Sequence, residues 1–285
     1  MHISARPYLG GWLLCLLGLF WTSCSKAPPP SPPPNPAKEI VSGILLRTMV
    51  TNVQESLANR RLAVAGLASN RVGSQELLRW LGEGALSNDL RPMLTLELAH
   101  VPWPEVRSQA WEVLPPYLDK NQKLLPPLQE FFKLRGDPNR GAALFRHPDL
   151  NCIGCHRLQG EGVAVGSDLS DIGLRMDAES LLESLLDPSA VITPGYETWL
   201  VVDDEENEYV GVLARETTAA VILRDAKNNE LVIPKPRIKQ RRQVPVSIMP
   251  AGLQQSMTLQ DLVDLWLFLR GCRQPPVTNA PSGGR

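Results

Sequence analysis

Five consecutive residues, Cys152-Ile153-Gly154-Cys155-His156, carry the clearest chemical signal in the chain. The pattern C-x-x-C-H is typical of c-type haem attachment, because two thiols at this spacing match the two vinyl groups of haem. His156 follows directly and is placed to bind the iron through an imidazole nitrogen. C-x-x-C pairs also occur in zinc sites and thioredoxin-like redox centres. The string therefore predicts covalent haem c, with those two chemistries as alternatives.

Two further cysteines indicate where the protein works. Cys15 lies in a stretch with a weakly positive start and a short apolar run, residues 13–20, which is typical of an export signal. Cys24 follows two small residues, as in a bacterial lipoprotein cleavage site, although Trp21 stands where a Leu-like residue is usual. We expect residues 1–24 to be a lipoprotein-type signal peptide that leaves Cys24 lipidated. The alternatives are ordinary secretion and an uncleaved anchor.

Composition narrows the class further. The 285 residues allow one or two domains, and the formal net charge of -1 gives no general attraction to nucleic acid. Apart from the cysteines assigned above, only Cys272 remains, so no disulfide framework can form. Haem attachment of this type takes place outside the cytoplasm. We therefore expect an exported, periplasmic protein, anchored through lipid to a bacterial membrane.

The haem motif is expected to lie in the second of two structured regions. Residues 25–37 are rich in proline and predict an extended linker of about 30 Å. Residues 38–135 show apolar residues at three- and four-residue steps, which predicts short helices in a HEAT-like repeat or an irregular bundle. Residues 136–273 form the expected haem domain, and residues 274–285 a disordered tail. The fold is therefore expected to be mainly α.

The sequence also predicts details of the helical region. Residues 70–74 are expected to break the helical pattern, and Asn88 to cap the helix that follows. Residues 121–134 are expected to form the last helix of this region. Trp80, Trp103 and Trp111 are interpreted as core residues, and none of these segments shows a chemical motif.

Two helices are expected to frame the haem domain. Asp137-Pro138 is a good helix start, because a capping side chain precedes a proline in the first turn. Residues 258–269 predict an amphipathic closing helix. The first and last helices of cytochromes c cross at close range over a small residue. We expect Gly141 to serve as that residue, facing Trp266.

The second axial ligand to iron is expected to be a methionine. A thioether is a soft ligand that stabilises ferrous iron. Of the six methionines, Met1 lies in the signal and two lie in the helical region, which leaves Met176, Met249 and Met257. Met249-Pro250 precedes the closing helix and resembles the distal ligand loop of class I cytochromes c. Met249 is therefore favoured, with Met176 as the alternative.

The segment between His156 and Met249 has strand character. Residues 196–202, 208–214, 219–223 and 230–233 are rich in β-branched and apolar residues, and Asn228-Asn229 is a turn signal. We expect a small antiparallel sheet inserted at about residues 195–245, which separates the two ligands in sequence.

From residue 136 to 271 the chain resembles the haem-binding domain family of enlarged, class I-like cytochrome c modules of the Planctomycete and Verrucomicrobial type. The motifs are Arg140-Gly141, the C-x-x-C-H, residues 166–173 (GSDLSDIG) with Arg175, and residues 247–253 (SIMPAGL). The resemblance implies one covalent haem c and electron transfer with periplasmic dehydrogenases, here a separate protein. Arg175 is a weak candidate for a haem propionate.

One residue departs from the family pattern. Ser167 stands where these modules usually have a proline that helps present a backbone carbonyl to the proximal histidine. A hydrogen bond to the far nitrogen of a ligating imidazole orients the ring. The proximal side is therefore expected to be less rigid here.

Two charge clusters flank the expected sheet. The acidic cluster consists of residues 203–206 and 208. The basic run consists of Lys235, Arg237, Lys239, Arg241 and Arg242. Alternation would place four positive charges on one strand face. This face is interpreted as a solvated edge that discourages aggregation, or as a docking surface for an acidic redox partner.

The expected function is one-electron transfer by a monohaem c-type cytochrome with His156 and Met249 as axial ligands. With both axial positions filled, the protein is expected to be an electron carrier rather than a catalyst. The alternatives are a haem enzyme or gas sensor with an open distal face, and a helical scaffold whose haem is accessory. No nucleic-acid partner is expected.

Overall fold

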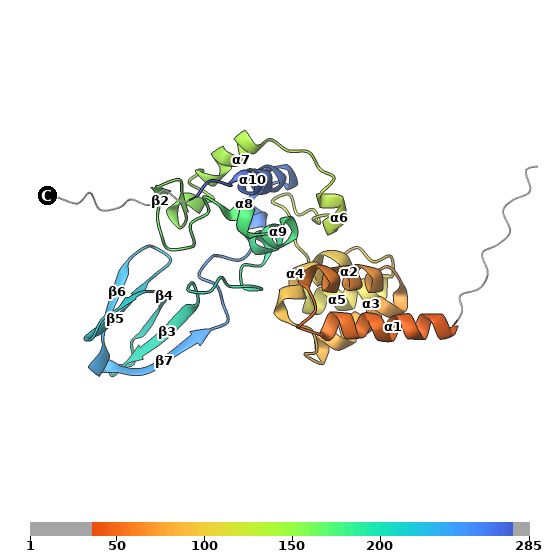
Figure 1. The fold of residues 1–285 in the computed structure, drawn as a ribbon, viewed down its shortest axis with the longest axis horizontal. Helices are drawn as coiled ribbons and strands as arrows, with labels where there is room; N and C mark the ends of the chain where they lie inside the picture. Colours follow the sequence, from red (N-terminus) through yellow and green to blue (C-terminus); the bar gives the residue numbers. More distant parts are fainter. Residues whose placement is uncertain (1–35, 276–285) are drawn as a thin grey trace, which may run out of the picture.

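The computed structural model describes residues 36–275, which combine helices with a five-stranded antiparallel sheet (Figure 1). The helices within this range are α1 (Pro36–Thr51), α2 (Leu57–Ala68), α3 (Arg71–Gly82), α4 (Arg91–Leu98), α5 (Pro104–Val113), α6 (Leu128–Phe131), α7 (Pro138–Phe145), α8 (Ile172–Arg175), α9 (Ala178–Leu186) and α10 (Leu259–Gly271). The expected signal peptide, Cys24 and most of the linker lie outside the described residues.

Local sequence signals set many of the helix ends. Ser56 and Asn70 cap α2 and α3 through side-chain oxygens that accept from backbone N–H groups in the first turn. Thr258 and Asp261 form a reciprocal capping box at the start of α10. Pro104 and Pro138 begin α5 and α7, as expected from their position in a first helical turn.

Four predictions in the helical region were wrong in detail, and one of them is the core position of Trp111, which is 40% exposed. The break expected at residues 70–74 is confined to the junction before α3, because Asn70 caps a helix that already includes Arg71. Asn88 does not cap α4; it begins a short 3-10 turn, and α4 starts at Arg91. Of residues 121–134 only α6 is helical. Asn121 and Lys123 instead donate backbone N–H groups to the Asp119 carboxylate, which holds an irregular turn.

The helical region and the region that carries the C-x-x-C-H share one hydrophobic core. The contiguous cluster of buried apolar side chains runs from Val50 to Leu269, on both sides of the expected domain boundary at residue 135. At the junction, the Trp266 ring of α10 stacks on Phe132, with centroids 5.2 Å apart, and meets Phe131 edge-on at 5.4 Å. The Trp266 indole N–H donates to the Ala178 carbonyl at 2.9 Å.

The helices α7 and α10 cross at Gly141, as expected. A methyl group at Gly141 would collide with the Asp264 carbonyl and the Phe268 side chain, so only glycine permits this approach. The residue that faces Gly141 is therefore Asp264 with Phe268. The expectation that Trp266 faces it was wrong, because the Trp266 ring turns toward Phe131 and Phe132 instead.

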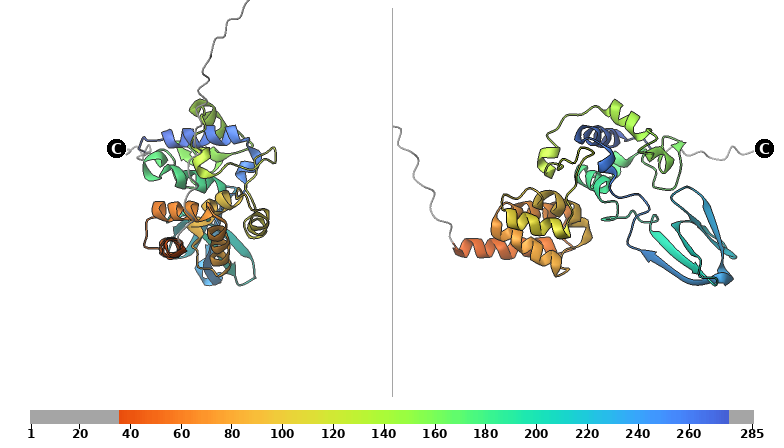
Figure 2. Two further views of the ribbon diagram at one scale, coloured as in Figure 1. Left: turned by 90° about the vertical axis from the view of Figure 1, so that its right-hand side faces the viewer. Right: turned by 180° about the vertical axis from the view of Figure 1, so that it is seen from behind.

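The inserted sheet has its own small core and projects from the helical body, as the views in Figures 1 and 2 agree. Its strand order is β6-β5-β4-β3-β7, with all pairs antiparallel. The strands are β3 (Thr198–Asp203), β4 (Glu208–Glu216), β5 (Ala220–Arg224), β6 (Glu230–Pro234) and β7 (Ile238–Val244). The four predicted strands are present, and β7 is a fifth that pairs with β3. A separate pair, β1 (Arg157–Leu158) and β2 (Glu161–Gly162), follows the C-x-x-C-H.

Candidate functional site

The C-x-x-C-H folds into a single tight turn. Cys152–Gly154 form a 3-10 turn, and the His156 and Cys155 N–H groups both donate to the Cys152 carbonyl, at 2.9 and 3.1 Å. A Cβ atom at Gly154 would lie within 2.5 Å of the Asn151 side-chain amide, which would have to move to admit it. Both cysteines and His156 consequently line the same cavity.

The cavity beside this turn has a volume of about 280 Å³ and is lined mostly by apolar side chains. A smaller apolar pocket of about 40 Å³ is lined by Cys152, His156 and Met249 as well. The walls come from α8, α9, the loop between β7 and α10, and the turn between β5 and β6. The lining includes Cys152, Cys155, His156, Met176, Ala226 and Met249.

The His156 ring is oriented by its neighbours. Its Nδ1 lies 2.7 Å from the Ser167 carbonyl oxygen, so Nδ1 carries the proton and donates to it. Burial lowers the pKa of His156, which favours the neutral ring. Nε2 is left with its lone pair, as a metal ligand requires. Ser167, which stands where the resembled family has a proline, therefore supplies the backbone carbonyl that accepts from His156.

Gly166 packs directly against the same ring. A Cβ atom at Gly166 would lie 2.5 Å from Cε1 and 2.9 Å from both ring nitrogens of His156. Its neighbours are fixed as well, because the Val165 and Gly166 N–H groups donate to the Cys155 carbonyl at 3.0 and 2.8 Å. The imidazole thus lies in a slot that admits only glycine at this point.

The two thiols do not have the properties of a redox disulfide pair. Cys152 and Cys155 are both free thiols. Burial raises the pKa of Cys152 to about 11 and also raises the pKa of Cys155. Thioredoxin-like centres depend on a lowered thiol pKa, so this environment disfavours that alternative.

A zinc site is disfavoured by the arrangement of donors. Within residues 36–275 no group of three or more His, Cys, Asp or Glu side chains is placed to hold a metal ion. Structural zinc needs four such ligands that converge on one point. The C-x-x-C-H therefore presents its donors to a cavity rather than to a common centre.

Three methionines lie around the cavity. Met249 lines both the main cavity and the small pocket, Met176 lines the main cavity, and Met257 lines the small pocket. Ser247 Oγ accepts from the Met249 N–H at 3.2 Å, and the Ser189 hydroxyl accepts from the Ser247 N–H at 3.0 Å. The loop that carries Met249 is thus tied to the segment after α9.

Arg175 is engaged away from the cavity. Its Nε donates to Asp171 at 2.6 Å, and another guanidinium N–H donates to the Asp168 carbonyl. Arg175 is not among the residues that line the cavity. Its expected contact with a haem propionate has no support in this arrangement.

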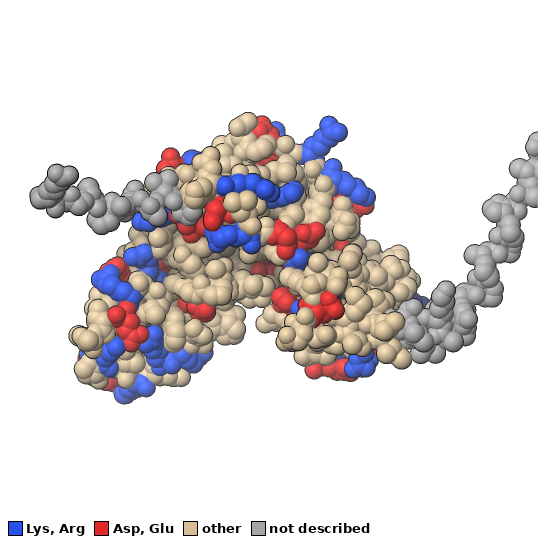
Figure 3. Space-filling view, in the orientation of Figure 1, with Lys and Arg blue, Asp and Glu red and all other residues tan. Residues whose placement is uncertain are grey.

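The basic run does not form one strand face. Pro236 lacks the N–H needed for a sheet ladder, so Lys235 and Arg237 lie in a 3-10 turn, and β7 begins only at Ile238. The run also pairs with the protein's own carboxylates: Lys235 and Arg241 with Glu216, Arg237 with Asp204 and Glu205, and Lys239 with Glu206, all at 2.7–2.9 Å. Figure 3 shows the two signs interspersed over the sheet. This supports the interpretation of a solvated, self-paired surface.

Two site features were missed from sequence. Ala226, in the turn after β5, lines the cavity, and Arg224 donates to the Ala164 carbonyl in the loop that follows the C-x-x-C-H. Asn228-Asn229 indicates a turn, but nothing in the local pattern says that this turn meets a loop 60 residues earlier in the chain.

Comparison with protein-family models and with curated proteins gives no match for this chain. Among the helices of residues 36–275, none combines the length and the apolar character needed to span a membrane.

Proposed function

We propose that this chain is a monohaem c-type cytochrome that transfers single electrons. The observation that carries the proposal is the convergence of Cys152, Cys155, His156 and Met249 on one apolar cavity. Two free thiols, a neutral imidazole with an open Nε2 and a thioether are the donor set that covalent haem c requires. The cavity itself supplies the apolar surroundings.

Each of these residues has a defined part in the proposal. Cys152 and Cys155 would hold the haem through thioether bonds, and His156 Nε2 and Met249 Sδ would bind its iron. The bound haem supplies a one-electron couple. Ser167 holds the proton on His156 Nδ1, and the apolar walls restrict water. A methionine ligand favours the ferrous state.

The finer fold assignment belongs to the same proposal. The crossing of α7 and α10 at Gly141, followed by the C-x-x-C-H turn and a Met-Pro loop before α10, supports an enlarged cytochrome c module with an inserted sheet. The preceding helices α1–α6 are proposed to be a HEAT-like region. Its shared core with the haem module favours a supporting role over an independent scaffold.

The proposed setting is the periplasm, with a lipid anchor on Cys24 and a separate redox partner, such as a dehydrogenase. Because four of the five residues in the basic run are paired internally, recognition of that partner through a free basic patch is disfavoured. The alternative functions are a haem enzyme and a gas sensor, each with an open distal face.

The reduced protein's absorption spectrum, recorded with and without carbon monoxide, tests the proposal. A six-coordinate electron carrier predicts a haem c spectrum that carbon monoxide changes slowly or not at all. Rapid carbon monoxide binding would show an open distal face and favour the enzyme or sensor. Absence of any haem spectrum from mature protein would reject all three.

A further inference from the structure

Few polar contacts join the five-stranded sheet to the rest of the molecule. Within residues 36–275, one hydrogen bond links the strands β3–β7 to the segments outside residues 198–244. The donor is Arg224, the last residue of β5, and the acceptor is the Ala164 carbonyl, at 2.7 Å. The ion pairs of the sheet, in contrast, all join residues within it.

Arg224 is held ready for this contact by the sheet. Its second guanidinium nitrogen pairs with Glu230 at 3.2 Å, and Glu230 is its direct cross-strand partner on β6. Arg215 of β4 pairs with the same carboxylate through two bonds of 2.9 Å. The Arg224 side chain is 27% exposed and Arg215 is 56% exposed. Both arginines therefore share Glu230, but Arg224 alone of the two reaches Ala164.

The acceptor lies in the loop that surrounds the proximal histidine. Val163 and Val165, on either side of Ala164, donate their N–H groups to Ile153 and Cys155 in the haem motif. Two residues further on, Gly166 packs against the His156 ring, and Ser167 accepts its Nδ1 proton. A force on Ala164 is thus transmitted to the His156 ring through a few hydrogen bonds.

The same arginine places a part of the sheet at the cavity. Ala226 lies two residues after Arg224 and lines the cavity. The turn that carries it is rigid, because the Asp225 carboxylate accepts from the Lys227 and Asn229 N–H groups at 2.9 and 2.7 Å. If Arg224 releases Ala164, the turn is free to leave the cavity wall.

We propose that Arg224 is a positioning residue that latches the inserted sheet onto the proximal loop. Its bond to the Ala164 carbonyl holds residues 163–167 around His156 and seats the β5–β6 turn against the cavity. The latch thereby restricts solvent and small ligands at the haem. This last consequence rests on the proposed function, whereas the latch itself does not.

The latch is tested first by amide hydrogen exchange on the full chain, whether or not haem is attached. Arg224→Ala should raise the exchange rates of the Val165 and Gly166 amides roughly tenfold, as expected for the loss of a supporting hydrogen bond. Arg215→Ala, which removes the other partner of Glu230, should leave both rates unchanged. Unchanged rates in Arg224→Ala, or an equal rise in both variants, would overturn the proposal.

The consequence for the haem is tested by imidazole binding to the oxidised, haem-loaded protein. Arg224→Ala should increase the association rate constant several-fold over wild type, and Arg215→Ala should not. Equal rate constants in all three proteins would reject a role at the haem. If the chain carries no haem at all, the proposed function fails, and the exchange experiment still decides whether Arg224 is a latch.

Discussion

The His156 ring depends on the absence of a side chain at Gly166. We expect Gly166→Ala to push the ring from its hydrogen bond with Ser167, because the added Cβ would lie 2.5 Å from Cε1. Forcing an extra carbon into packed surroundings costs about 1–3 kcal/mol. Denaturant unfolding and the haem spectrum measure the effect. Gly271→Ala is the matched control, since nothing lies near its Cβ position. Equal behaviour of the two variants would contradict the slot described for His156.

Substitution tests whether Met249, rather than Met176 or Met257, is the methionine that binds iron. We expect Met249→Ala to lower the reduction potential by on the order of 0.1 V, within the ~0.8 V range over which axial ligands act. The cause is the loss of a soft thioether that favours ferrous iron. Redox titration measures the shift, and Met176→Ala and Met257→Ala serve as controls. A shift in Met176→Ala alone would transfer the ligand role to that residue.

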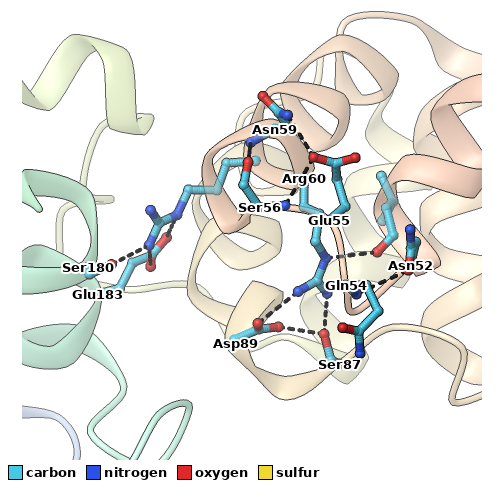
Figure 4. Close-up of polar contacts among 12 residues, drawn as sticks. Asn52, Gln54, Glu55, Ser56, Asn59, Arg60, Ser87, Asp89, Ser180 and Glu183 are labelled. Carbon is cyan, nitrogen blue, oxygen red and sulfur yellow. Dashed lines mark hydrogen bonds and ion pairs between the residues drawn. The ribbon is translucent and has the colours of Figure 1, made fainter.

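Among the contacts between elements, Arg61 joins α2 to α9 across the two regions of the chain. Figure 4 labels Ser180 and Glu183, the two α9 residues that it contacts. Its guanidinium makes two bonds to the Glu183 carboxylate and one to the Ser180 hydroxyl. The Arg61 and Glu183 side chains are 6% and 7% exposed. Since α9 also contributes Ser184 and Leu185 to the cavity wall, this pair positions the wall.

Removal of Arg61 leaves the Glu183 carboxyl buried without its partner, where burial already raises its pKa to about 7. We expect Arg61→Met to lower the free energy of unfolding by about 3–5 kcal/mol. The double variant Arg61→Met with Glu183→Leu should recover most of that loss, since neither charge remains. Chemical denaturation measures both. An Arg61→Met protein as stable as wild type would show that the pair contributes nothing to the joint between the regions.

The turn between β3 and β4 is organised by the Asp203 carboxylate. Asn207, Tyr209 and the Glu205 N–H donate to it, with Asn207 the largest cause, and together they lower the pKa of Asp203 from 3.8 to about 2. The folded state therefore holds the proton less tightly than the unfolded state. The contribution of Asp203 to stability is complete above about pH 4 and is lost as the pH falls toward 2.

This linkage predicts an acid-sensitive sheet. Amide exchange in residues 203–209, corrected for intrinsic exchange, should accelerate as the pH falls from about 4 to about 2. This pH window is set by the lowered pKa of Asp203. Asp203→Asn should exchange faster at neutral pH and lack this acid-induced step. An identical acid response in wild type and Asp203→Asn would assign the transition to another carboxylate.

Across the whole molecule, the features that could be predicted are those encoded within a few residues. The C-x-x-C-H, the proline helix starts at Pro104 and Pro138, and four of the strands follow from local spacing. The contacts that arrange these parts could not be predicted. Arg61 and Glu183 are 122 residues apart and Arg224 and Ala164 are 60 apart, and no local pattern pairs them.

Two segments of irregular backbone were also predicted wrongly as regular secondary structure. Residues 117–127 lack regular helix because Asp119 binds nearby N–H groups, an alternative that helical periodicity does not register. The start of β7 is displaced by a single proline within an otherwise alternating run. For the site, the two cysteines proposed for covalent attachment and the two proposed iron ligands line the cavity, whereas Arg175 does not.

The most direct test of the proposed function is the mass of the mature protein, isolated from the exported fraction of bacteria that make c-type cytochromes. A c-type cytochrome should show a mass increase of one haem, carried by the peptide that contains Cys152 and Cys155. Cys152→Ser with Cys155→Ser should abolish the increase. A wild-type protein without added mass and with both thiols free would contradict the account.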